Sequence, residues 1–103
     1  MDIFMTVEDA EGEQMGEAIE IGKLQRHFKT LETGVCLRFV SDDDDAVFNQ
    51  RQLPCLLEEL ETLSAKVTKA DEKDELAAVL KLCRKAAGKK NVFVKFYGEK
   101  VAD

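Results

Sequence analysis

Residues 35–63 read VCLRFVSDDDDAVFNQRQLPCLLEELETL, and this stretch contains both of the periodicities that decide the fold. In residues 35–40 side chains alternate between two faces, which is typical of a β-strand, and residues 46–49 resume that character after the aspartates. From Leu53 onward the leucines recur at i, i+3, i+4 and i+7, which indicates an amphipathic helix with Pro54 in its first turn. The stretch therefore predicts a β-hairpin over residues 35–49, followed by a helix.

The chain before this stretch predicts a second pair of strands and a short helix. Residues 3–7 alternate, and residues 18–21 form a second strand-like run after a glycine-containing turn, so the two are expected to pair as a hairpin. Residues 21–31 change to helical spacing, and Gly34 follows at a position suited to ending a helix.

The chain after the stretch predicts one more helix and a closing strand. Asp71 is the expected N-cap and Gly88 the expected end of a helix that packs as an antiparallel hairpin on its predecessor. The side chains expected to face inward from this helix are Leu76, Val79, Leu80, Cys83 and Ala87. Residues 92–97 carry apolar side chains on both faces, which predicts a strand inside the sheet.

The predicted order is β-β-α-β-β-α-α-β, which is an α+β fold. We expect a mainly antiparallel β-sheet of about five strands, with an αα-hairpin and one short helix packed on it. The length of 103 residues and the 45% apolar content predict a single domain over residues 1–103 with a real core.

The composition also indicates the cellular compartment in which the protein is expected. No apolar run is long enough for a membrane span, and the acidic start of the chain lacks the pattern of a secretory signal. The cysteines are odd in number, widely spaced and without a CxxC pair, which favours a reducing compartment over a disulfide framework. We therefore expect a cytoplasmic protein.

The net charge of −6 is unevenly distributed. Residues 1–45 carry twelve acidic and four basic side chains, whereas residues 46–103 carry nine acidic and eleven basic ones. An acidic total makes nucleic acid an unlikely partner, since the phosphate backbone is repelled, whereas it can steer a basic protein. The candidate partner-binding residues are Asp42, Asp43, Asp44, Asp45, Arg84, Lys85, Lys89 and Lys90. The alternatives are a solvated turn for the aspartates and a complement to the helix dipole for the basic residues.

Few residues in the sequence suggest chemistry. The aspartates do not fit a calcium loop, because counting from Asp42 places Ala46 at position 5 and Leu53 at position 12. Cys55 is expected in the first turn of a helix, where amide dipoles favour a thiolate, but no second cysteine is evident near it. Cys36, Cys83 and His27 are expected to be structural. We predict no catalytic residue, no metal site and no cofactor.

The segments LRFVSDDDDAVFNQRQLPCLLEELETL and VFVKFYGE together resemble a family of small uncharacterised bacterial proteins. The shared pattern is a strand, an aspartate-containing turn, VFN, a helix that begins near a proline, and a closing KFYG strand. That family has a glycine in the turn, where this chain has aspartates. The family has no established activity, so the resemblance implies no site residues.

These features favour a non-enzymatic protein–protein interaction module, for example an inhibitor of the immunity type that masks a basic partner. One alternative is a small thiol-based enzyme or redox sensor that uses Cys55. The other is a structural homo-oligomer, and the sequence is compatible with either a monomer or a homodimer.

Overall fold

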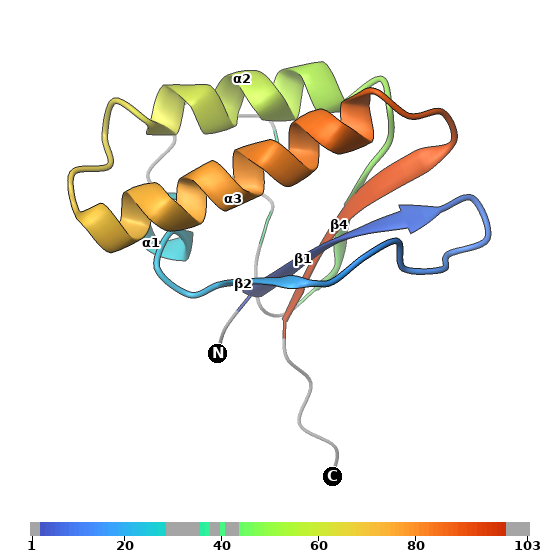
Figure 1. Cartoon of the computed structure of the whole chain (residues 1–103), viewed down its shortest axis with the longest axis horizontal. Coiled ribbons are helices and arrows are strands. Elements are labelled where there is room, and N and C mark those ends of the chain that lie inside the picture. Colours follow the sequence, from blue (N-terminus) through green and yellow to red (C-terminus); the bar gives the residue numbers. More distant parts are fainter. Residues whose placement is uncertain (1–2, 29–35, 38–39, 41–43, 99–103) are drawn as a thin grey trace, which may run out of the picture.

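The computed structural model describes residues 3–28, 36–37, 40 and 44–98. In these residues it has an α+β architecture, as predicted, with four strands and three helices (Figure 1). The elements in chain order are β1 (Ile3–Asp9), β2 (Ile19–Ile21), α1 (Gln25–Phe28), β3 (Ala46–Phe48), α2 (Leu53–Leu63), α3 (Ala70–Ala87) and β4 (Val92–Gly98).

The four strands form one antiparallel sheet in the order β2-β1-β4-β3. The two long strands β1 and β4 lie in the middle and pair along their whole length, from Ile3 opposite Gly98 to Asp9 opposite Val92. The prediction that the last strand lies inside the sheet is therefore confirmed. Its apolar side chains on both faces follow from this position, since an inner strand exposes little of its backbone edge to water.

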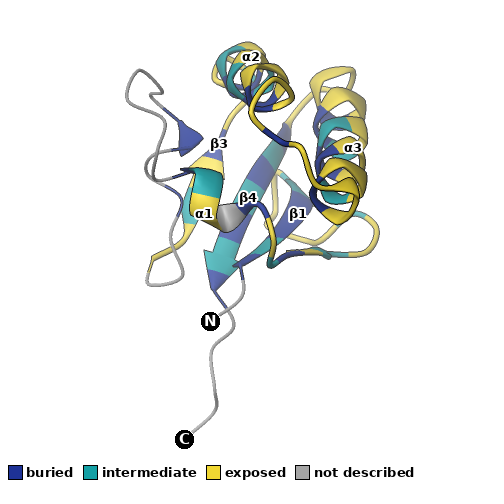
Figure 2. Ribbon diagram, turned by 90° about the vertical axis from the view of Figure 1, so that its left-hand side faces the viewer, coloured by how far each residue is buried: buried dark blue, intermediate teal, exposed yellow. Residues whose placement is uncertain are grey.

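The described helices pack on one face of this sheet, with α2 and α3 lying side by side over it (Figure 1). Figure 2 shows their buried residues turned toward the sheet and their exposed residues turned outward. Four leucines of α2 are fully buried, as the predicted stripe requires, and Pro54 lies in the first turn. The buried residues of the sheet and the helices belong to one core cluster.

Two details of α3 differ from the prediction. The helix begins one residue before Asp71, with Lys69 as its N-cap, and the Asp71 carboxylate instead accepts the backbone N–H of Glu72 at 2.8 Å. At the other end the predicted inward residue, Ala87, is exposed and Ala86 is buried instead. The next inward-facing position after Cys83 is therefore three residues along the helix rather than four. The helix ends at Gly88, as predicted.

The main correction concerns residues 35–40, which were predicted to be a strand. Cys36 lies in a bend and Leu37 in a 3₁₀ turn. The backbone carbonyl of Leu37 accepts the N–H of Val40 at 3.1 Å. The backbone N–H groups of Cys36 and Leu37 donate to the carboxylate of Glu59 on α2 instead of to a neighbouring strand. The described part of the segment therefore adds no fifth strand, and β3 pairs with β4 alone. Residues 35, 38–39 and 41–43 lie outside the described residues.

Of the helix predicted over residues 21–31, only residues 25–28 form α1 among those that the structure describes, because Ile21 belongs to β2 and residues 22–24 are bends. Residues 29–31 and Gly34 lie outside the described residues. Its Phe28 ring meets the Phe96 ring of β4 edge-on, at 6.4 Å between centroids. The chain that leads into α1 is held by Glu75 of α3, whose carboxylate accepts the N–H groups of Gly22, Lys23 and Leu24. In the described part of the chain, no helix combines the length and the apolarity that crossing a membrane requires.

Candidate functional site

The face of the sheet opposite the helices is a surface that the described elements leave without a helix. Side chains alternate along a strand, so the residues between the buried positions of β1 and β4 point to this side. We call it the open face, and its described strand residues are Phe4, Thr6, Glu8, Glu20, Val47, Phe93, Lys95 and Tyr97. It combines aromatic rings with charges of both signs.

The apolar part of the open face is organised around neighbouring rings. Phe4 and Tyr97 face each other across β1 and β4, with centroids 5.6 Å apart and planes inclined by 22°. Val47 of the edge strand β3 is 50% exposed, and it is the one large apolar side chain that is exposed among the described residues. The face therefore carries apolar surface at the Phe4–Tyr97 stack and at Val47, which pairs with Lys95.

The polar part of the open face is built around Lys95. Its Nζ lies 3.5 Å from Glu8 Oε2 and 3.6 Å from Asp45 Oδ2, and 5.6 Å from the centre of the Tyr97 ring. These residues line a hollow of about 320 Å³ together with Thr6 and Gln14. Because two carboxylates share one ammonium group, the surroundings of Lys95 are acidic on balance.

The predicted partner-binding residues are divided between several surfaces. Asp42 and Asp43 lie outside the described residues, Asp44 is exposed, and Asp45 belongs to the hollow on the open face. Arg84 contacts Glu61 of α2 at 3.3 Å, whereas Lys85 and Lys89 line a different hollow of about 370 Å³ between α3 and the β1–β2 connection. Lys90 is exposed beyond the end of α3.

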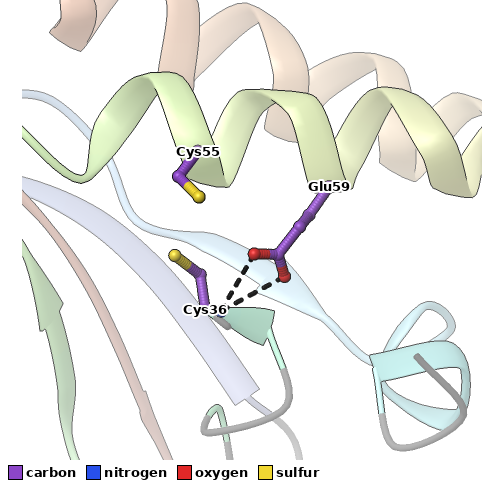
Figure 3. Close-up of side chains that lie close together, drawn as sticks. All are labelled: Cys36, Cys55 and Glu59. Atoms are coloured by element: carbon purple, nitrogen blue, oxygen red, sulfur yellow. Dashed lines mark hydrogen bonds between the residues drawn. The ribbon is translucent and has the colours of Figure 1, made fainter. Parts of the chain in front are cut away.

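A separate group of side chains, two thiols and a carboxylate, lies where α2 meets the bend at residues 36–37 (Figure 3). The Sγ atoms of Cys36 and Cys55 and a carboxylate oxygen of Glu59 all lie within 4.8 Å of one another. We call these three residues the thiol–carboxylate cluster. Cys55 and Glu59 are one helical turn apart on α2, so both point toward Cys36, which corrects the prediction that no second cysteine lies near Cys55.

Burial controls the protonation of the inner thiols. Removal from water, the Glu59 carboxylate and the neighbouring Cys55 together raise the pKa of Cys36 to about 12, so this thiol is neutral near pH 7. Cys83 is a residue of α3 that is buried in the core, and desolvation raises its pKa to about 12. The prediction that Cys36 and Cys83 are buried is confirmed.

His27 lies beside the buried carboxylate of Glu72. Its Nε2 lies 2.7 Å from Oε2 of Glu72, a carboxylate that also accepts two hydrogen bonds from Arg26 Nη2 at 2.7 and 3.0 Å. The Glu72 side chain is 3% exposed and the Arg26 side chain 60% exposed, so a buried carboxylate is paired with an exposed guanidinium where α1 packs against α3. The prediction of a structural histidine is supported by these contacts.

Sequence patterns gave no sign of the open face or of the thiol–carboxylate cluster as units. The i, i+4 spacing of Cys55 and Glu59 was a usable signal for two of the three cluster residues, but the approach of Cys36 depends on the path of the chain between α1 and β3. Comparison with family models, with curated proteins and with solved structures finds no match to this chain.

Proposed function

We propose that this protein is a non-enzymatic binding module that holds a basic protein partner against the open face of its sheet. The observation that carries the proposal is the combination, on a face without a described helix, of the Phe4–Tyr97 stack, the exposed Val47 and the acidic surroundings of Lys95. Protein–protein interfaces are enriched in aromatic side chains and combine them with polar groups.

The charges of the face favour a basic partner. Its described acidic side chains are Glu8, Glu20 and Asp45, and its described base is Lys95. A partner with lysine or arginine beside an apolar patch would therefore gain attraction at these carboxylates while it covers the rings and Val47. Such complementarity accelerates association and makes the complex sensitive to salt.

The same charges argue against single-stranded nucleic acid as the ligand. Sheets that bind such strands combine stacking rings with a positively charged groove along the backbone. Here the base nearest the rings, Lys95, is already shared by Glu8 and Asp45. A phosphate would therefore approach two carboxylates as well as one ammonium group.

The test compares two variants that add the same charge to different surfaces. Val47→Lys places an ammonium group at the exposed apolar position of the open face, on the edge strand β3, and Ala78→Lys places one on the exposed side of α3. The unaltered protein and both variants are used as bait in a lysate of the source organism at low and high salt. Proteins that are captured at low salt are then purified, and their dissociation constants are measured with each bait.

We expect the captured partner to be a basic protein that binds the unaltered chain and Ala78→Lys with equal affinity. It should bind Val47→Lys at least tenfold more weakly and should dissociate from the unaltered chain at high salt. Equal binding by both variants would reject the open face as the site. Sedimentation of the unaltered protein alone separates a heterologous partner from self-association, because a dimer that Val47→Lys dissociates would identify a second copy of the chain as the occupant instead.

A further inference from the structure

The thiol–carboxylate cluster has the donor set of a site for a thiophilic metal ion. It offers two sulfurs and one carboxylate oxygen, which are ligands that Zn²⁺ accepts. The donors come from two separate elements, the bend at Cys36 and the helix α2, so an ion bound there would connect parts of the chain that are 19 residues or more apart (Figure 3).

The spacing of the donors is close to what a tetrahedral ion requires. With Zn–S bonds of about 2.3 Å and a Zn–O bond of about 2.1 Å, two sulfurs lie about 3.8 Å apart and a sulfur and an oxygen about 3.6 Å apart. The three donor atoms already lie within 4.8 Å of one another, so closure onto an ion requires shifts of about 1 Å or less. A disulfide would require the sulfurs to approach to about 2.0 Å, which is a larger movement.

The carboxylate is also held in the manner of a metal ligand. Glu59 Oε2 accepts the N–H of Cys36 at 2.9 Å, and Oε1 accepts the N–H of Leu37 at 2.9 Å. Backbone hydrogen bonds of this kind fix the orientation of a ligating carboxylate. The same bonds keep Cys36 beside α2, so the site is partly assembled without the ion.

We propose that Cys36, Cys55 and Glu59 form a binding site for a single thiophilic divalent cation of the Zn²⁺ class. Binding forms two metal–sulfur bonds and one metal–oxygen bond, and the two thiol protons pass to the buffer. The protein supplies three ligands, and the fourth tetrahedral position takes a water molecule or a side chain of a partner. Cys55 is half-buried, so this position can be reached from the surface of α2.

The experiment titrates the reduced protein with Co²⁺ in a phosphine reductant that lacks thiols, and then displaces Co²⁺ with Zn²⁺. We expect one equivalent of Co²⁺ to produce thiolate-to-metal charge-transfer absorption, and one equivalent of Zn²⁺ to remove it. Cys55→Ser should weaken Zn²⁺ binding by at least about 100-fold, the upper end of what the loss of an outer hydrogen-bond partner costs. Glu59→Gln should weaken binding but keep the thiolate absorption.

Cys83→Ser is the matched control, because it removes a cysteine that lies in the core and outside the cluster. It should bind both ions as the unaltered protein does, and circular dichroism verifies that each variant is folded. Absence of charge-transfer absorption from the folded, reduced protein would overturn the proposal, and so would equal Zn²⁺ affinity in Cys55→Ser. A Cys36–Cys55 disulfide that forms in air, with no metal bound after reduction, would assign the pair to redox chemistry instead.

Discussion

Glu72 is a buried carboxylate that joins α1 to the first turn of α3. Its oxygens receive hydrogen bonds from Arg26, and one of them lies 2.7 Å from His27 Nε2. The hydrogen bond from Arg26 is the main cause that lowers the pKa of Glu72 below its ordinary 4.5, against the opposing effect of burial, and His27 adds to the lowering. This carboxylate therefore stabilises the fold only while it is ionised.

The consequence is a pH dependence of stability with a defined sign. Because the folded-state pKa of Glu72 is lowered, its contribution is present above about pH 4.5 and is lost as the pH falls through the folded-state value. In urea unfolding between pH 7 and pH 3, we expect Glu72→Gln to be less stable than the unaltered protein at pH 7 and to approach it at the acid end. Exposed Glu58 supplies the control, and Glu58→Gln should follow the unaltered protein throughout. Parallel curves for Glu72→Gln and the unaltered protein would contradict this account.

Helices α2 and α3 show how much of a single element can be predicted from the periodicity of its apolar residues. The leucine spacing located α2 and its buried side, because an amphipathic helix is specified by residues that are close in the chain. The same reasoning placed β1 and β4. It was wrong for the described residues of the predicted strand 35–40, because the amides of Cys36 and Leu37 are satisfied by Glu59, which is more than 20 residues away.

That error explains why the thiol–carboxylate cluster could be predicted only in part. A strand at residues 35–40 would have turned alternate side chains toward a sheet, whereas the observed bend presents Cys36 to α2 (Figure 3). The decisive interaction is a side chain of one element capping the backbone of another. No local pattern encodes such a contact, and the open face likewise appears only once the helices are known to share one side of the sheet.

The buried stripe of α2 gives a prediction for this element. Leu60 is fully buried in the core. Leu57 is the same residue type on the same helix, but it is only partly buried. Leu60→Ala should therefore reduce the free energy of unfolding by about 2–5 kcal/mol, and Leu57→Ala by clearly less. Urea titrations with an unchanged slope would verify that the denatured state is unaffected. Equal losses from the two substitutions would mean that the stripe is assigned to the wrong side of α2.

At the scale of the whole molecule, the order β2-β1-β4-β3 makes the long strands the centre of the structure and the short ones its edges. The inner strands pair with each other along their whole length, pair with the edge strands over part of it, and lie under the helices, so they open only with most of the fold. Hydrogen exchange should find the slowest amides in β1 and β4, and faster exchange in β2 and β3. Amides of β3 as slow as those of β4 would indicate that this edge is covered in solution.

The pairing of Ile3 with Gly98 brings the first and last described strand residues next to each other across the central ladder (Figure 1). Adjacent strands are separated by only about 5 Å, so a linker of a few residues could join the two ends without disturbing the sheet. A circular permutant in which residues 3 and 98 are linked, and which is opened at exposed Lys66 between α2 and α3, would then keep every strand pair.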